Sequence, residues 1–326
     1  MTKRLSLLLA LLSCNAVAQT TLTDNDLRKL FIITGTSAIS TTNSYGGVVL
    51  FKSFFDIYGN ACGLKKHYNT TIFVDEEGGS VVRIPSANTP SPVQSKKMDT
   101  VSFYSGVEYS AKKLKEVCVD VNLAPFVESS KYTTRSYSSQ TNEVIAKATV
   151  FSNAMQSQGI RTVVKHFPAW NQNCESIYNI DSLKLTLKPK SEVLKCSLPD
   201  SDKALFEEKA KVFVSVPSNA VMISNNVIPE LGKYPNTMNP KIRDILRKDL
   251  GYKNVLISDA LWEIQASPKA VLMALKVVDW VMVGEADDAE KAIPAIRSAI
   301  DSGELTEEEI REKIRLIESF KQGIQE

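Results

Sequence analysis

Two polar side chains, Lys165 and His166, directly follow the apolar run 162–164. Threonine and valine favour β-structure, so the run predicts a strand. Pro168 cannot donate a ladder hydrogen bond and keeps the residue before it out of a helix, so we expect the strand to open into a loop here. An ammonium and an imidazole at a strand end suit the binding of polar substrate groups. The alternative is a solvated basic strand end.

Charged side chains also follow other apolar runs. Asp75 comes directly after the run 71–74, and Gly78 and Gly79 allow a tight turn that could bring Arg83 back to the same place. An ordinary acidic turn is the alternative. Asp259 follows the run 255–257 in the same way, where it could act in catalysis or cap a following helix.

Eight short apolar runs alternate with amphipathic or loop segments, which predicts a single-domain (β/α)₈ TIM barrel. An open doubly wound sheet is the runner-up, but no glycine-rich phosphate loop follows the first run. In a barrel the ends of parallel strands share one mouth, so the polar side chains above should meet there. The predicted strands are residues 31–33, 48–51, 71–74, 119–123, 162–164, 221–223, 255–257 and 280–283.

Helical periodicity predicts the elements that position these strands. The last stretch carries Thr306 followed by Glu309, which is typical of a capping box. The predicted helices include 107–117, 142–158, 240–250 and 304–325.

The first 18 residues are predicted to be a secretory signal peptide, because Lys3 and Arg4 precede the apolar run 5–12 and small residues follow at 16–18. We therefore expect residues 19–326 to form one barrel domain that is periplasmic or secreted. Residues 11–14 also resemble a lipoprotein box, which would make Cys14 a possible lipid anchor. No later stretch is long enough to span a membrane. The net charge of +2 over 326 residues implies no nucleic-acid partner.

Four cysteines remain after residue 18, namely Cys62, Cys118, Cys174 and Cys196. An even number in an exported chain fits two disulfides, and three pairings are possible. We favour Cys174 with Cys196, which would restrain the loop after His166. The spacing does not suit metal binding, so neither a metal nor a cofactor is expected.

Taken together, the motifs resemble glycoside hydrolase family 3, in its single-domain bacterial β-N-acetylglucosaminidase branch. The resemblance implies a barrel and a retaining hydrolase whose nucleophile is Asp259. It also implies that the terminal sugar is held by Asp75, Arg83, Arg135, Lys165 and His166. The motifs are Asp75-Glu76-Glu77-Gly78-Gly79 with Arg83, Asn122-Leu123-Ala124-Pro125, Arg135-Ser136-Tyr137, Lys165-His166-Phe167-Pro168, and Leu246-Arg247 through Leu250-Gly251-Tyr252 to Ser258-Asp259.

One motif departs from the family. Where the family has Gly-His-Gly and then Asp-Ser-His, with that last histidine as acid/base, this chain has Ala169-Trp170-Asn171 and no histidine follows. Glu175 and Asp181 lie on the same loop and could replace it as the catalytic acid, or both could be solvated.

Two functions follow from these patterns. The first is an exported retaining glycosidase that acts, as a monomer, on terminal β-linked N-acetylhexosamine in peptidoglycan or chitin-like fragments. The second is a carbohydrate-binding protein that kept the sugar pocket but lost turnover. A barrel of unrelated chemistry is a weaker third possibility.

Overall fold

The computed structural model describes residues 21–35, 38, 42–180, 184–186 and 193–322. Eight parallel strands form one sheet in the order β11-β10-β5-β4-β3-β2-β1-β12. A parallel bridge between Ile257 and Trp280 brings the two edge strands together, and the predicted (β/α)₈ barrel is confirmed. The strands are β1 (Phe31–Thr34), β2 (Gly47–Leu50), β3 (Thr71–Val74), β4 (Val121–Asn122), β5 (Arg161–Phe167), β10 (Ala220–Ile223), β11 (Val255–Ser258) and β12 (Val281–Met282).

The strand β5 continues further than predicted, through Lys165 and His166 to Phe167. Neighbours on both sides extend the ladder: Phe167 pairs with Ile223 of β10, and the carbonyl of Lys165 accepts a hydrogen bond from the Val127 nitrogen at 3.0 Å. Local sequence does not show these partners, because they come from distant segments. The two polar side chains therefore lie on the strand and not on a loop.

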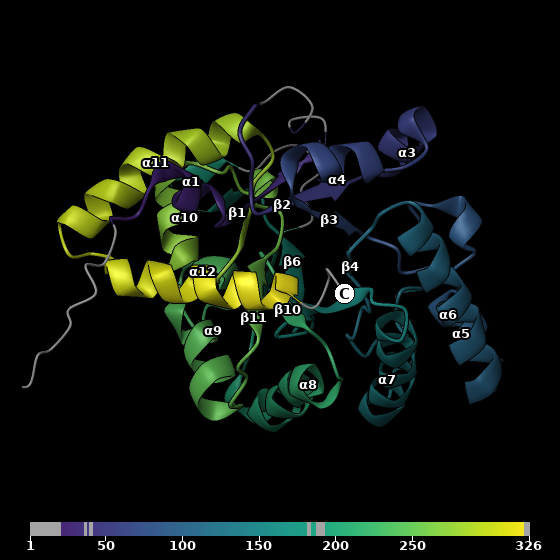
Figure 1. Ribbon diagram of the computed structural model, residues 1–326. Coiled ribbons are helices and arrows are strands. Elements are labelled where there is room, and N and C mark those ends of the chain that lie inside the picture. The colour runs from purple at the N-terminus through teal and green to yellow at the C-terminus, as the bar shows by residue number, and fades with distance from the viewer. Residues whose placement is uncertain (1–20, 36–37, 39–41, 181–183, 187–192, 323–326) are drawn as a thin grey trace, which may run out of the picture.

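Helices surround the strands on the outside of the barrel (Figure 1). The predicted helix over 107–117 begins seven residues earlier, because the Asp99 side chain caps it by accepting from the Ser102 nitrogen at 2.8 Å. The capping box of Thr306 and Glu309 is confirmed. The α-helices are α1 (Asp24–Arg28), α3 (Lys52–Tyr58), α4 (Cys62–Tyr68), α5 (Pro92–Ser95), α6 (Thr100–Glu116), α7 (Thr141–Gln156), α8 (Lys203–Ser215), α9 (Pro240–Asp244), α10 (Pro268–Leu275), α11 (Ala286–Asp301) and α12 (Glu307–Gln322).

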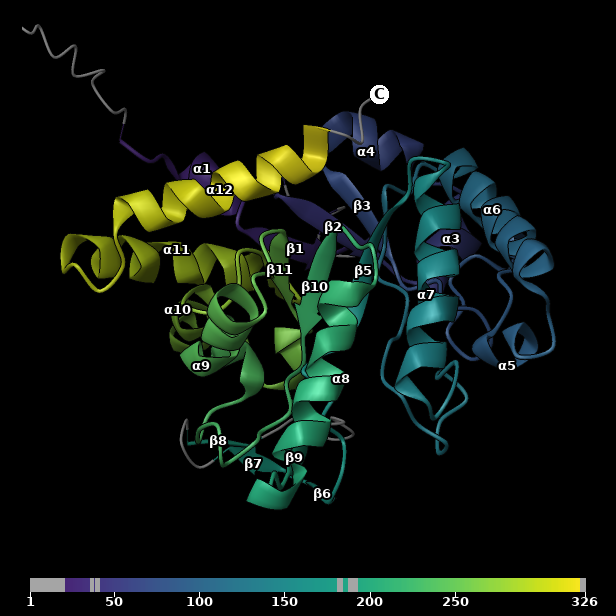
Figure 2. The same ribbon diagram turned by 90° about the horizontal axis from the view of Figure 1, so that it is seen from below.

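Helix α12 crosses the end of the barrel where the strands begin (Figure 2). At this end Asp279 is completely buried and accepts hydrogen bonds from Arg243 at 3.0 Å and Arg247 at 2.6 Å, while Lys313 of α12 lies 3.6 Å away. Burial alone would raise the pKa of Asp279, but these three cations outweigh it and lower that pKa. Arg247, at the start of its motif, thus lies at the underside of the barrel and not at its mouth.

The chain between β5 and α8 is tied at the opposite end of the barrel (Figure 2). A disulfide joins Cys174 to Cys196 across the antiparallel strands β6 (Cys174–Ser176) and β9 (Leu194–Cys196). The favoured pairing is confirmed, and the other two cysteines, Cys62 and Cys118, form the second disulfide. A further short pair is formed by β7 (Asn179–Ile180) and β8 (Leu185–Thr186).

Trp170 anchors the start of this segment. Its ring nitrogen donates to the carbonyl of Ser197 at 2.8 Å, and its ring packs edge-on against Phe206 of α8. Within the described part of the chain, no helix is both long and apolar enough to cross a bilayer. The predicted signal peptide and Cys14 lie outside the described residues.

Candidate active site

A cavity of about 1260 Å³ opens at the carboxyl ends of the barrel strands. Its wall is built by segments that follow β3, β4, β5, β10 and β11, which is where a barrel enzyme carries its chemistry. The structure brings six of the predicted site residues to this wall: Asp75, Arg83, Arg135, Lys165, His166 and Asp259.

Lys165 lies on one side of this cavity and joins two carboxylates. Its Nζ is 2.6 Å from Oδ1 of Asp75 and 2.7 Å from Oε1 of Glu77. Burial alone would lower the pKa of Lys165, but the two carboxylates outweigh it and raise that pKa. Lys165 is therefore a buried, fully charged ammonium that is held in place by its partners.

Glu77 also receives both arms of the Arg135 guanidinium, with Nε at 2.9 Å and Nη2 at 2.7 Å from its two oxygens. Burial raises the pKa of Glu77, but the charges of Lys165 and Arg135 outweigh burial and lower that pKa to about 2. The sequence-based analysis missed Glu77. In an extended chain, side chains two residues apart point to the same side. Glu77 is two residues after Asp75, so this pattern could have identified Glu77 as a site residue.

Glu76, between them, points the other way and shapes the loop. Its buried carboxylate accepts from the backbone nitrogens of Arg83 at 2.7 Å and Ile84 at 3.0 Å. The Asn122 side chain exchanges two hydrogen bonds with the Glu76 backbone, at 2.9 and 2.8 Å. This brings Arg83 back toward Asp75, where Nη2 and Oδ2 are 3.5 Å apart. Asn122 and Glu76 therefore position the site without lining it.

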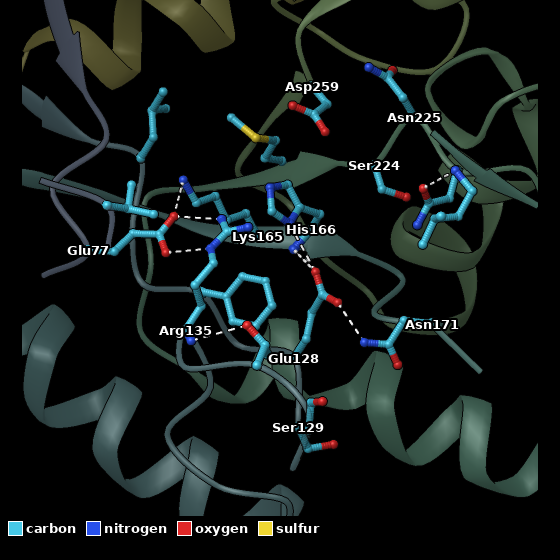
Figure 3. A pocket seen from close by; sticks show the side chains of 18 of the residues that line it. Glu77, Glu128, Ser129, Arg135, Lys165, His166, Asn171, Ser224, Asn225 and Asp259 are labelled. Atoms are coloured by element: carbon cyan, nitrogen blue, oxygen red, sulfur yellow. Dashed lines mark hydrogen bonds and ion pairs between the residues drawn. The ribbon is translucent and has the colours of Figure 1, made fainter. Parts of the chain in front are cut away.

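Asp259 faces the cavity from the other side (Figure 3). Its backbone nitrogen donates to the carbonyl of Ile223, and its Oδ1 accepts from the Ala260 nitrogen at 2.8 Å. Among the described residues, no donor occupies Oδ2. The short 3₁₀-helix η6 (Leu261–Glu263) begins after Ala260 and has no side-chain cap, so Asp259 is not its N-cap. Its second oxygen is therefore open to a ligand.

A third cluster connects the segment after β4 with β5. Glu128 Oε1 lies 2.9 Å from Nδ1 of His166, and Asn171 donates to Glu128 Oε2 at 3.1 Å. All three residues line the cavity. The analysis of the sequence missed Glu128 and Asn171, because neither belongs to a motif that indicates chemistry.

The described structure does not bring Glu175, the first of the two predicted acids on the loop after β5, to this site. Glu175 lies on β6, its side chain is 67% exposed, and it pairs with Lys195 at 3.2 Å. It does not line the cavity. Asp181 lies outside the described residues. In the described ranges, no group of three or more His, Cys, Asp or Glu side chains could hold a metal.

Comparison with known proteins agrees with this geometry. The sequence profile of the glycosyl hydrolase family 3 N-terminal domain matches residues 65–320. An uncharacterized secreted glycosyl hydrolase of Arthroderma benhamiae is 25% identical over 313 residues, which cover 86% of each chain. A β-hexosaminidase of Psychromonas ingrahamii is 27% identical over 237 residues, or 66% of each chain.

The crystal structure of β-N-acetylhexosaminidase from Beutenbergia cavernae shares the fold, with a TM-score of 0.74 at 19% identity. The match covers 93% of this chain and 100% of that chain. Since the family profile spans most of the sequence, the chain belongs to glycosyl hydrolase family 3 and is a glycosyl hydrolase.

Proposed function

We propose that the protein is an exported retaining glycosidase that removes terminal β-linked N-acetylhexosamine from peptidoglycan or chitin-like fragments. The observation that carries this proposal is that one cavity is lined both by the open carboxylate of Asp259 and, on another side, by the charged cluster around Lys165. The names of the hexosaminidase relatives support the choice of sugar.

The residue types suit the binding of a sugar. Asp75, Arg83, Arg135, Lys165 and His166 would surround the terminal ring, whose hydroxyls both donate and accept hydrogen bonds. Ion pairs hold Asp75, Arg83, Lys165 and Arg135 in place before a ligand arrives, so binding requires little further ordering of these side chains.

Asp259 would then attack the anomeric carbon through Oδ2. A bond from that oxygen to the carbon forms as the bond to the leaving oxygen breaks, which gives a covalent glycosyl-enzyme. Water later attacks the same carbon and releases Asp259, so the configuration is retained.

The test is turnover of an aryl β-N-acetylglucosaminide by the mature protein and by its Asp259→Asn variant. We expect kcat to fall by about 10³-fold or more, because the amide cannot form the intermediate. Asp301→Asn, on the exposed end of α11, is the matched control and should keep full activity. A 2-deoxy-2-fluoro glycoside should label the peptide that contains Asp259. Tight sugar binding without turnover by the unchanged protein would contradict the proposal and support a binding protein.

Export is proposed on the signal-peptide pattern, the two disulfides and the secreted relative. We expect the protein isolated from its native host to begin at Gln19, as N-terminal sequencing would show. A lipid-modified Cys14 at the N-terminus would instead identify an anchored lipoprotein.

A further inference from the structure

Lys209 of α8 differs from the other buried lysines of the described chain, which are Lys165 and Lys313. Lys165 is paired with two carboxylates, and Lys313 lies 3.6 Å from Asp279. The ammonium of Lys209 instead donates to the hydroxyl of Ser129 at 2.7 Å and to the carbonyl of the same residue at 3.2 Å. Both acceptors are neutral oxygens. Within the described ranges, Lys209 therefore has no carboxylate as a direct partner.

The two nearest carboxylates do not supply the missing counter-ion. The oxygens of Glu128 are engaged by His166 and Asn171, at 2.9 and 3.1 Å. Glu208 lies at an exposed position of α8. Burial outweighs the charges of Glu128 and Glu208 and lowers the pKa of Lys209. Since a buried ammonium without a counter-ion is unfavourable, an anion that reached Lys209 would be bound favourably.

The cavity gives a ligand access to Lys209. Lys209 and Ser129 both line it, although they come from α8 and from the segment after β4. In the view of Figure 3, Glu128 lies between Ser129 and Asp259. The volume of about 1260 Å³ exceeds the roughly 300–1,000 Å³ of a site for a drug-sized ligand. The cavity therefore has room for more than the terminal sugar ring.

We propose that Lys209 is a specificity-determining residue, which binds a carboxylate on the sugar that leaves. An ammonium has three hydrogens to donate. Ser129 accepts two of them, which fixes the direction of the ammonium and leaves the third for a ligand.

This inference rests on the proposed function and narrows it. In peptidoglycan the leaving sugar is N-acetylmuramic acid, which carries a carboxylate on its lactyl ether. Fragments of chitin have no charged group at that place. A carboxylate site at Lys209 therefore favours peptidoglycan fragments over chitin-like fragments as the substrate.

The experiment compares two substrates that differ only in this charge. One is N-acetylglucosaminyl-β-1,4-N-acetylmuramic acid, and the other is its methyl amide, in which the lactyl group is neutral. We expect the unchanged protein to have the higher kcat/KM on the acid. In Lys209→Met the ratio of the two kcat/KM values should fall by about 10- to 100-fold, because a charge-assisted hydrogen bond is lost. Lys209→Arg, which keeps the charge, should retain most of the preference.

Lys211→Met is the matched control, since Lys211 is exposed on the same helix and does not line the cavity. Its ratio should equal that of the unchanged protein. An equal loss on both substrates in Lys209→Met would overturn the proposal and leave Lys209 as a tie between α8 and the segment after β4. Absence of a preference for the acid in the unchanged protein would also overturn it, and this comparison needs no variant to fold.

Failure of the proposed function gives a different result, because the unchanged protein would then not turn over the aryl β-N-acetylglucosaminide. The same two disaccharides are in that case compared by titration calorimetry. A lower Kd for the acid than for the amide, lost in Lys209→Met, would support the carboxylate site. Equal Kd values for the acid and the amide in the unchanged protein would overturn it.

Discussion

At the scale of single residues, the site depends on a carboxylate that is almost completely buried. Glu77 is 2% exposed and lies within hydrogen-bond reach of two cations, Lys165 and Arg135. A buried ion pair contributes little more to the stability of a protein than well-packed apolar side chains in its place would. Removal of one partner alone, however, leaves an uncompensated buried charge. Glu77 therefore keeps the two cations in place and the cavity charged.

Glu77→Gln should consequently lower the free energy of unfolding by about 3 kcal/mol or more, because Lys165 and Arg135 lose their shared counter-ion. The pKa of Glu77 is lowered to about 2 in the folded state, from about 4.3 when unfolded. The contribution of ionised Glu77 to the free energy of unfolding is thus complete above about pH 4 to 5 and is lost as the pH falls toward 2.

Urea unfolding at several pH values would measure this effect. The unchanged protein should lose stability between about pH 5 and pH 2 more steeply than Glu77→Gln. Parallel pH dependences in the two proteins would contradict the prediction. Asp301→Asn, whose carboxylate is on the surface of α11, is again the control.

At the scale of elements, the segment between β5 and α8 distinguishes this chain from the family pattern that it resembles. Trp170 occupies the place of a glycine-rich turn and is buried against α8, and the disulfide of Cys174 and Cys196 joins β6 to β9. The ladder between β6 and β9 is only three residues long, so it contributes little stability alone. We infer that the disulfide stabilises this hairpin.

A double variant, Cys174→Ala with Cys196→Ala, should therefore open the hairpin. The bridge closes a loop of 22 residues, for which the chain-entropy estimate is about 3 kcal/mol. Amide hydrogen exchange in β6 and β9 should become faster, while exchange in β10, a fully buried strand of the barrel, should not change. Equal acceleration in both regions would show that the disulfide supports the whole barrel instead.

At the scale of the whole molecule, the two ends of the barrel have separate roles. The cavity lies at the carboxyl ends of the strands, whereas Asp279 and its cations lie at the opposite end beneath α12. Polar clusters at the amino-terminal face of a barrel serve stability, and those at the carboxyl-terminal face serve catalysis.

Asp279→Asn should test this separation. The substitution leaves Arg243, Arg247 and Lys313 without their buried counter-ion, so we expect a loss of about 3–5 kcal/mol in the free energy of unfolding. Measured well below its midpoint of thermal unfolding, kcat on the aryl glycoside should stay within about twofold. A large fall in kcat with unchanged stability would refute the division between the two ends.

The sequence by itself determined which charged residues follow the strands, and it predicted the barrel. It left three cysteine pairings open and favoured Cys174 with Cys196. Those features depend on local periodicity, on turn residues and on a strand order that the barrel imposes. Only the tertiary structure decided which side chains meet. Glu128 reaches His166 across 38 residues, and Glu77 reaches Arg135 across 58. Such pairs depend on strand register and on loop paths, and both are set by packing between distant segments, which no local pattern records.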